Sequence, residues 1–298
     1  MTRRGFLKGL LGTTLAGLFL GAYAMGIEPG LRMRVQRWAV QPRNWPKGQR
    51  LRIVMIADLH AAAPQMTEAR IARIIETANG LGGDLIVLMG DYRASHRFQT
   101  RRVPVDAVAP LLARLSAPLG VHAILGNHDW WDDGDAQRRR SGPIHTQTVL
   151  ESAGIPVLVN RAVRVGPQES GLWLAGVDSQ ASFRGHRWGR DAGMDDLPGT
   201  LAQVTDDAPV ILLAHEPDIF PKVPDRVALT LSGHTHGGQI RFGPWVPVVP
   251  SAYGARYAYG HVVEDGRDLV VSGGLGCSIM PIRFGMPPEI TVVEIGKT

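Results

Sequence analysis

The first 125 residues alternate short apolar runs with helical patterns. Residues 50–57, 84–89 and 120–125 are mostly apolar, and each run is followed by Asp or Gly. Runs of this length are typical of buried strands. Residues 67–78 and 105–115 place apolar side chains at helical spacing. The resulting β-α-β-α-β order predicts a largely parallel central sheet.

The second half of the chain has short apolar runs instead. The runs that predict strands lie at residues 156–159, 161–166, 171–177, 209–213, 227–231, 268–273 and 289–295. Near the start of the chain, Leu31, Met33 and Val35 alternate with polar residues, which predicts a half-exposed strand. We expect the later strands to form a second sheet packed on the first, in one α/β domain.

The amino terminus has the pattern of a targeting or anchoring segment. Arg3 and Arg4 precede Phe6, and residues 9–27 carry no charge. This pattern resembles a twin-arginine export signal. A helix over these 19 residues would span roughly 28 Å, close to the hydrocarbon thickness of about 30 Å. An Ala-x-Ala triplet at residues 22–24 offers a cleavage site, so both a cleaved signal and a retained apolar helix are open.

Charge is distributed unevenly along the chain. The 298 residues carry 32 Lys and Arg against 27 Asp and Glu, a formal net charge of +5. Residues 51–298 carry only 23 of the basic side chains but 26 of the acidic ones. A nucleic-acid-binding domain usually has a basic body, so no nucleic acid partner is expected. The excess in the first 50 residues instead favours an anionic membrane surface.

These patterns divide the chain into three parts. Residues 1–27 are predicted to be the signal or anchor, and residues 28–50 a basic juxtamembrane segment with the first strand. Residues 51–298 are predicted to form the main domain. Cys277 is the only cysteine, so the fold needs no internal disulfide. No Walker A loop, Rossmann glycine fingerprint or H-E-x-x-H motif occurs, which argues against ATPases, dehydrogenases and zincins.

Polar side chains follow five of the apolar runs. They are Asp58 and His60, then Asp91, then Asn127, His128 and Asp129, then His215, and finally His234 and His236. Because loops leave parallel strands at one edge of a sheet, these side chains are expected to meet there. Carboxylate and imidazole ligands together suit Mn, Fe, Zn or Co. A shared carboxylate can bridge two such ions about 3.5 to 4 Å apart, as in phosphoryl-transfer enzymes.

The five blocks together resemble the calcineurin-like metallophosphoesterase superfamily. Its pattern D-x-H, G-D, G-N-H-D/E, H and G-H-x-H occurs complete and in order between Asp58 and His236. The resemblance implies an αββα sandwich, in which two packed mixed β-sheets are flanked by helices. It also implies a binuclear-metal hydrolase of phosphoric esters. Residues 273–276 and 287–290 are similar to the membrane-associated, exported bacterial branch.

The resemblance further implies a role for each motif residue. The first metal ion would be held by Asp58, His60, Asp91 and His236. The second would be held by Asp91, Asn127, His215 and His234, so that Asp91 bridges the pair. Two divalent transition-metal ions are expected, with Mn favoured over Fe and Zn. His128 would act as proton donor or electrostatic stabiliser at the leaving-group oxygen.

One position departs from the family pattern. Many members read G-D-x-x-D, and the second Asp orients the catalytic His, but Ala94 stands there in this chain. Asp129 or a main-chain group is expected to orient His128 instead. We therefore expect His128 to be a weak general acid that favours leaving groups needing little protonation. The adjacent Trp130 and Trp131 either floor a substrate pocket or simply pack.

The leading functional prediction is a hydrolase of phosphodiester or pyrophosphate bonds with cell-envelope or lipid-linked substrates. Export by the twin-arginine machinery would place it on the outer face of the bacterial cytoplasmic membrane or in the periplasm. A phosphomonoesterase or nucleotide phosphatase is an alternative, because the same metal pair serves both. A non-catalytic metal-dependent scaffold is another. The remaining histidines are expected to be surface or core groups: His96, His122, His145, His186 and His261.

Overall fold

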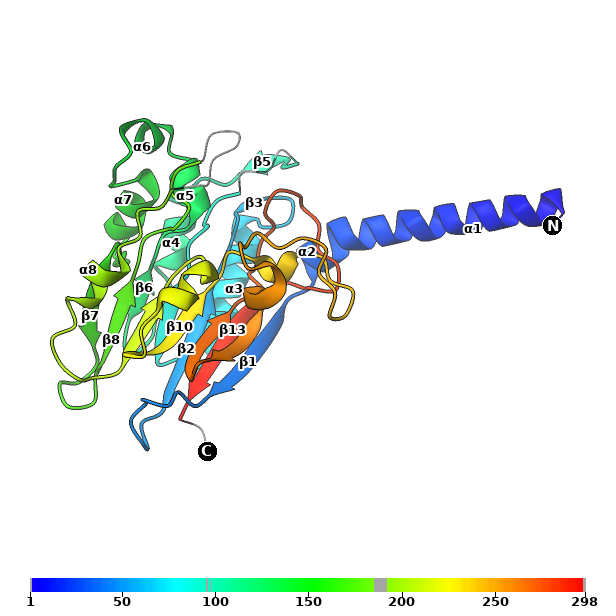
Figure 1. The fold of residues 1–298 in the computed structure, drawn as a ribbon. Coiled ribbons are helices and arrows are strands. Elements are labelled where there is room, and N and C mark those ends of the chain that lie inside the picture. The colour runs from blue at the N-terminus through cyan, green and yellow to red at the C-terminus, as the bar shows by residue number, and fades with distance from the viewer. Residues whose placement is uncertain (1, 95, 97, 185–191, 297–298) are drawn as a thin grey trace.

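Two β-sheets pack face to face between helical layers in the computed structural model, which describes residues 2–94, 96, 98–184 and 192–296. Figure 1 shows this body with helix α1 projecting from it. Apolar side chains fill three layers: between the helices and the first sheet, between the sheets, and outside the second sheet. The predicted α/β fold of two packed mixed sheets is confirmed.

The first sheet contains the strands predicted early in the chain. Its order is β1 (Arg34–Val40), β13 (Glu289–Ile295), β2 (Leu51–Ile56), β4 (Leu85–Leu88) and β6 (Val121–Ala123). Three of the four pairings are parallel, and only β13 runs antiparallel to β2. The expectation of a largely parallel sheet is therefore correct.

The second sheet has six strands. Its order is β11 (Gly260–Glu264), β12 (Arg267–Val271), β10 (Val227–Ser232), β9 (Val210–Leu213), β8 (Leu172–Gly176) and β7 (Arg161–Val165). A small ribbon pairs β3 (Ala62–Ala63) with β5 (Arg101–Arg102). The first and second sheets meet through β2, β4, β9 and β10, whose apolar side chains fill the layer between them.

The helices lie outside the two sheets. Those that cover the first sheet are α3 (Glu68–Gly80), α4 (Val105–Leu112) and α7 (His145–Ser152). Short helices α5 (Asn127–Trp131), α6 (Gly134–Arg139) and α8 (Leu197–Leu201), with 3₁₀ turns at Pro217–Lys222, His236–Gly238 and Gly254–Tyr257, lie in the connections. The two predicted helices are present, and the side chain of Thr67 caps α3 by accepting the N–H of Arg70.

Three expectations need correction. Strand β13 was expected in the second sheet but lies inside the first, where all seven of its residues are buried. Residues 156–159 form no strand, because only Val157 makes a bridge, with Ala123. The first strand begins at Arg34, since residues 28–31 form helix α2. Its half-exposed character is as predicted.

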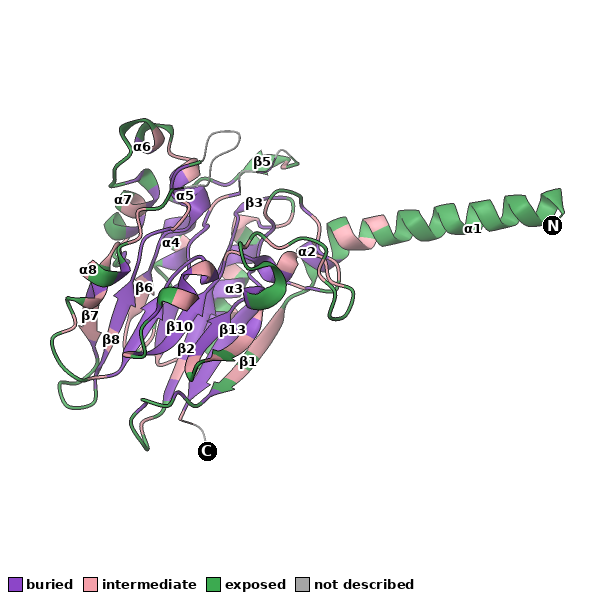
Figure 2. Ribbon diagram, viewed as in Figure 1, coloured by how far each residue is buried: buried purple, intermediate pink, exposed green. Residues whose placement is uncertain are grey.

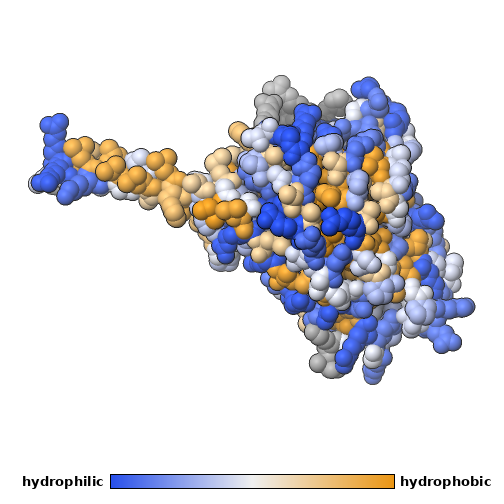
Figure 3. Space-filling view, turned by 180° about the vertical axis from the view of Figure 1, so that it is seen from behind, coloured by the Kyte–Doolittle hydropathy of each residue, from blue (hydrophilic) through white to orange (hydrophobic). Residues whose placement is uncertain are grey.

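The N-terminal segment has an exposed part and a docked part. Helix α1 (Arg3–Ala22), the π-helical turn Tyr23–Ile27 and α2 (Glu28–Leu31) form one run that is long and apolar enough to cross a membrane. Figure 2 shows α1 exposed along most of its length, and Figure 3 shows hydrophobic side chains along it up to the body. Glu28, in contrast, is buried and accepts the main-chain N–H of Met286 at 2.7 Å.

Candidate metal centre

Five loops bring the predicted ligands together at the carboxyl ends of β2, β4, β6, β9 and β10. The first cluster consists of Asp58, His60 and His236, whose ligand atoms lie within 4.8 Å of one another. His60 Nε2 is 3.0 Å from His236 Nε2, and His236 Nε2 is 3.7 Å from Asp58 Oδ1. All three side chains are buried.

A second cluster adjoins the first through Asp91. Its members are Asp91, His215 and His234, again with ligand atoms within 4.8 Å. Asp91 Oδ2 lies 3.2 Å from His215 Nε2 and 3.3 Å from His60 Nε2 of the first cluster. Asn127 Oδ1 is 2.9 Å from His234 Nδ1, which places Asn127 with the second cluster. Asp91 therefore lies between the two groups, as a bridging ligand would.

The donor atoms fit metal ions better than they fit each other. Within the described part of the chain, Asp58 Oδ2 and His215 Nε2 are buried without a hydrogen-bond partner. Two ligands about 2.1 Å from one ion lie roughly 3.0 to 3.4 Å apart when the angle at the ion is about 90 to 109°. The separations of His60 Nε2 from His236 Nε2 and of His215 Nε2 from Asp91 Oδ2 match this spacing. The residues present thus fit a pair of divalent ions.

Main-chain carbonyls orient two of the histidines. His215 Nδ1 lies 2.6 Å from the carbonyl oxygen of Met89, and His60 Nδ1 lies 3.3 Å from that of Arg93. Donation from Nδ1 to a carbonyl leaves the Nε2 lone pair free to bind a metal. In both residues Nε2 is the atom that faces Asp91.

The ligand loops have a strained backbone. Positive φ angles occur at five of the predicted ligands: Asp58, His60, Asp91, His234 and His236. Such angles are uncommon for residues with a side chain and cluster at functional sites. The glycines beside them allow close packing, since a Cβ on Gly126 would lie 2.2 Å from Asp91 Oδ1 and one on Gly276 would lie 2.7 Å from His60 Cβ.

Burial and neighbouring charges set the protonation of the ligands. Burial raises the pKa of Asp58. Burial also opposes charge on Asp91, but His215 and the other imidazoles outweigh it and hold the Asp91 pKa well below its usual range. Burial lowers the pKa of His236 well below its ordinary value, so this imidazole is neutral and available as a ligand. Two buried carboxylates need cations nearby, and a metal pair would supply them.

His128 lies beside the clusters, and its main-chain N–H donates a hydrogen bond to Asp91 Oδ1 at 2.9 Å. Its Nε2 is 3.2 Å from the hydroxyl oxygen of Ser278, a residue that the sequence motifs did not indicate. Burial lowers the pKa of His128 to about 3, so its imidazole is neutral at physiological pH. A neutral imidazole can still donate an N–H hydrogen bond to a phosphoryl oxygen, but it is a far weaker acid than imidazolium.

Asp129 positions the loops around Asp91. Its carboxylate accepts the N–H groups of Asp91 and Gly126, at 2.9 and 2.8 Å, and that of Tyr92 at 3.1 Å. Burial and the charge of Asp91 raise the Asp129 pKa to about 7. The contacts of this carboxylate with three main-chain groups make Asp129 a positioning residue for the loops after β4 and β6. That Asp129 or a main-chain group orients the His128 side chain stays a prediction.

The two tryptophans have different roles. Trp130 is buried, packs on Phe183 and donates its indole N–H to Asp178 at 2.8 Å, so it packs rather than lining a pocket. The ring of Trp131 lies 4.9 Å from that of His128, at the edge of the metal site. Of the other histidines, His145 and His261 pair with carboxylates. The ring of His122 lies near the main-chain carbonyl of Leu119, and His96 is buried. His186 lies outside the described residues.

Arg283 is a buried cation behind the first cluster that sequence analysis did not identify. Its guanidinium donates twice to the carbonyl of Gly276, at 2.8 and 2.6 Å, and once to that of Met286 at 3.0 Å. One guanidinium nitrogen also lies 3.1 Å from His236 Nδ1. The main-chain N–H of Arg283 donates to Ala24, so this loop joins the N-terminal segment to the metal site.

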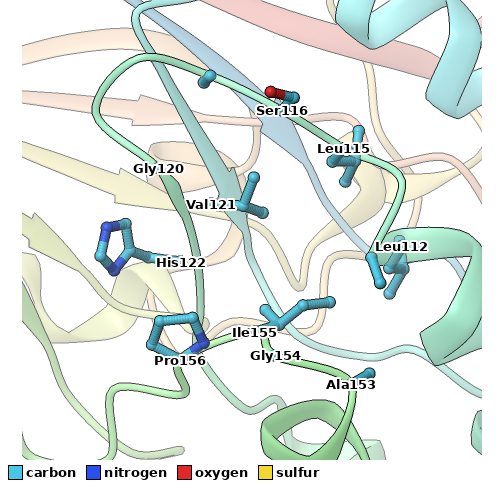
Figure 4. A pocket seen from close by; sticks show the side chains of 12 residues that line it. Leu112, Leu115, Ser116, Gly120, Val121, His122, Ala153, Gly154, Ile155 and Pro156 are labelled. Carbon is cyan, nitrogen blue, oxygen red and sulfur yellow. The ribbon is translucent and has the colours of Figure 1, made fainter.

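A cavity elsewhere on the surface has no connection to these residues. Its volume is about 390 Å³, and it lies between the end of α4, the start of β6 and the end of α7 (Figure 4). The only titratable side chain on its wall, within the described chain, is His122. The chemistry of the molecule therefore belongs to the strand-end loops.

Comparison with known proteins agrees with this geometry. A family model described as calcineurin-like phosphoesterase matches residues 51–238, which include all five ligand loops. The chain belongs to the calcineurin-like phosphoesterase family. It is 32% identical over 305 residues to the uncharacterized metallophosphoesterase YkuE of Bacillus subtilis, covering 100% of this chain and 99% of that protein. It is 30% identical over 281 residues to an uncharacterized metallophosphoesterase of Aquifex aeolicus, covering 93% and 97%.

A third relative has a name that refers to membranes. The transmembrane protein with metallophosphoesterase domain of Danio rerio is 29% identical over 258 residues, which cover 82% of this chain and 53% of that protein. The predicted family is thus confirmed. This metallophosphoesterase is a metal-dependent phosphoric ester hydrolase, and its clustered Asp and His residues form a site of the dimetal type.

Proposed function

We propose that this metallophosphoesterase hydrolyses phosphodiester or pyrophosphate bonds with two divalent transition-metal ions, Mn²⁺ in preference to Fe or Zn. The position of Asp91 carries the proposal, because its Oδ2 lies close to both His60 Nε2 and His215 Nε2. When bound, such a metal pair supplies a hydroxide nucleophile at neutral pH and polarises the phosphoryl oxygens.

Each predicted ligand has a place in this scheme. The first ion would be held by Asp58, His60, Asp91 and His236, and the second by Asp91, Asn127, His215 and His234. Asp129 fixes the positions of the loops after β4 and β6, because its carboxylate accepts main-chain N–H groups from both. His128 would donate an N–H to a phosphoryl or leaving-group oxygen, with Ser278 fixing its Nε2.

The preference for diesters and pyrophosphates follows from His128. Because its imidazole is neutral, it contributes little to protonation of an alkoxide leaving group. Leaving groups that depart as stable anions need no such help, and the phosphate released from a pyrophosphate is one of them. Ala94, which stands where many family members have a second Asp, also suggests that His128 is a weak acid.

We also propose that the protein works at a membrane. Helix α1 is exposed and apolar, with Arg3, Arg4 and Lys8 in its first turns and Arg32 directly after the helical run. The loop between β1 and β2, which carries Arg43, Lys47 and Arg50, lies at the end of the body far from α1 (Figure 1) and does not belong to this basic group. Basic side chains next to an apolar helix are attracted to anionic lipid. The paired arginines favour export by the twin-arginine machinery to the outer face of the cytoplasmic membrane or the periplasm. Envelope-derived or lipid-linked phosphoesters are then the accessible substrates.

A comparison of two aryl esters tests the proposed activity. The full chain in mild detergent with Mn²⁺ should turn over a bis-aryl phosphodiester with a kcat/KM at least about tenfold above that for the aryl monoester, because the two share a leaving group that needs no protonation and the diester carries less negative charge. Faster monoester hydrolysis would instead indicate a phosphomonoesterase or nucleotide phosphatase. Two bound metal ions with no hydrolysis of either ester would indicate a scaffold.

A further inference from the structure

An apolar pocket adjoins the first metal cluster. Its volume is about 260 Å³, and the apolar side chains on its wall are Ile240, Val248, Pro250, Ile279, Met280 and Ile282. Thr235 and His236 complete part of the wall. Because His236 also belongs to the first cluster, the pocket and the metal site share this residue.

Two paired loops build this pocket. Residues 239–242 run beside residue 284, with the N–H of Arg241 donating to the carbonyl of Phe284 and the N–H of Phe284 donating to that of Gln239. The second loop also carries Ser278, which contacts His128. The segment that begins at Ser278 therefore forms part of the pocket wall and also contacts His128.

The same loops expose large apolar side chains near the end of the N-terminal helix. Trp245, Val248 and Ile279 are 61%, 70% and 73% exposed. A row of aromatic contacts joins Trp245 to the helix end: Tyr23 touches Phe284, Phe284 touches Phe242, and Phe242 touches Trp245, with ring centroids 5.3 to 6.1 Å apart. Figure 1 shows these loops, coloured orange to red, beside the body end of α1.

This arrangement indicates a lipid rather than a water-facing surface. Exposed apolar patches of this kind mark interaction sites, and Trp and Tyr are enriched at membrane interfaces. If α1 enters a bilayer, the aromatic row lies at the level of the headgroups, because it starts at Tyr23, directly after α1. The pocket, whose wall includes Val248 and Ile279 of the same loops, then lies close to the bilayer surface.

We infer that the pocket holds the hydrocarbon chain of a membrane-resident phosphoester while its phosphoryl group lies at the metal centre. The inference rests on the proposed function and specifies its substrate class: a phosphoester with an attached alkyl or acyl chain. The chain is held by Ile240, Ile279 and Ile282, and His236 marks the boundary between the apolar pocket and the polar site.

Alkyl phosphates of one, four and eight carbons test this inference by binding alone. Calorimetry would use the full chain with Mn²⁺ in nanodiscs, with empty nanodiscs as the reference. Full burial of a methylene contributes about 0.8 kcal/mol, and half of that is roughly a twofold change in affinity. The Kd is therefore expected to fall about 100-fold from methyl to octyl phosphate. A Kd independent of chain length would overturn the inference.

Exposed positions provide variants that should leave the fold intact. Ile279→Asp and Val248→Asp are expected to reduce the chain-length effect below about tenfold. Val263→Asp, at a 61% exposed site on β11, is the matched control and should keep the full effect. Equal chain-length effects in Ile279→Asp and Val263→Asp would also overturn the inference.

The two proposals can fail separately in this design. Hydrolysis of the bis-aryl diester is measured on the same samples. Loss of hydrolysis with an intact chain-length effect would refute the phosphodiesterase proposal but support the pocket. Hydrolysis with no chain-length effect would refute the pocket and leave the phosphodiesterase proposal standing.

Discussion

Asp91→Asn is expected to lower kcat/KM for the bis-aryl phosphodiester by at least about 10³-fold, which corresponds to about 4 kcal/mol of lost transition-state stabilisation. The substitution keeps the size of the side chain but removes the charge shared by the two clusters. We also expect the Mn²⁺ content to fall from two ions per chain to at most one. Elemental analysis and steady-state kinetics on the same samples measure both effects.

Two control variants sharpen this result. Asp265→Asn makes the same chemical change at an exposed position and should alter neither metal content nor rate. His128→Ala should keep two ions and lose about 10²-fold in rate, because His128 is proposed to act on substrate oxygen and not as a ligand. If Asp91→Asn retained two ions and reacted within tenfold of wild type, Asp91 would not be the bridging ligand.

Arg283→Met is expected to have the largest effect on stability. The guanidinium is fully buried and satisfies the carbonyls of Gly276 and Met286, which methionine would leave without a donor. Buried unsatisfied groups cost about 1 to 3 kcal/mol each, so a loss of about 3 kcal/mol is expected. For a domain of this size that lowers Tm by about 6 to 12 °C, measurable by thermal unfolding of the metal-free protein.

The metal site should also respond to Arg283→Met. Loss of a residue that contacts a ligand from behind typically weakens metal binding by about 10- to 100-fold, here through His236. Arg256→Met is the control, because Arg256 is exposed and pairs with Glu264 at the surface. Equal Tm shifts in the two variants would contradict the structural role assigned to Arg283.

The parts of the structure that could be predicted depend on local patterns. Continuous apolar runs identified β2, β4, β9 and β10, because strands buried on both faces admit few polar side chains. The residue that follows such a strand lies at the sheet edge, so Asp58, Asp91 and His215 could be placed near one another from the sequence. The structure brings all of the predicted ligands to this edge.

The parts that could not be predicted depend on contacts between distant residues. Ser278 and His128 are 150 residues apart in the chain, and Glu28 and Met286 are 258 apart. Arginine is usually exposed, so nothing in the sequence around Arg283 indicates a buried cation. The position of β13 between β1 and β2 depends in the same way on pairings that short-range periodicity does not specify.

Anomalous diffraction from crystals grown with Mn²⁺ tests the central claim most directly. The account predicts two peaks about 3.5 to 4 Å apart, one on each side of Asp91 Oδ2. The peak near β2 should contact His60 and His236, and the other should contact His215 and Asn127. A single peak, or two peaks that do not share Asp91, would contradict the binuclear site on which the proposed activity depends.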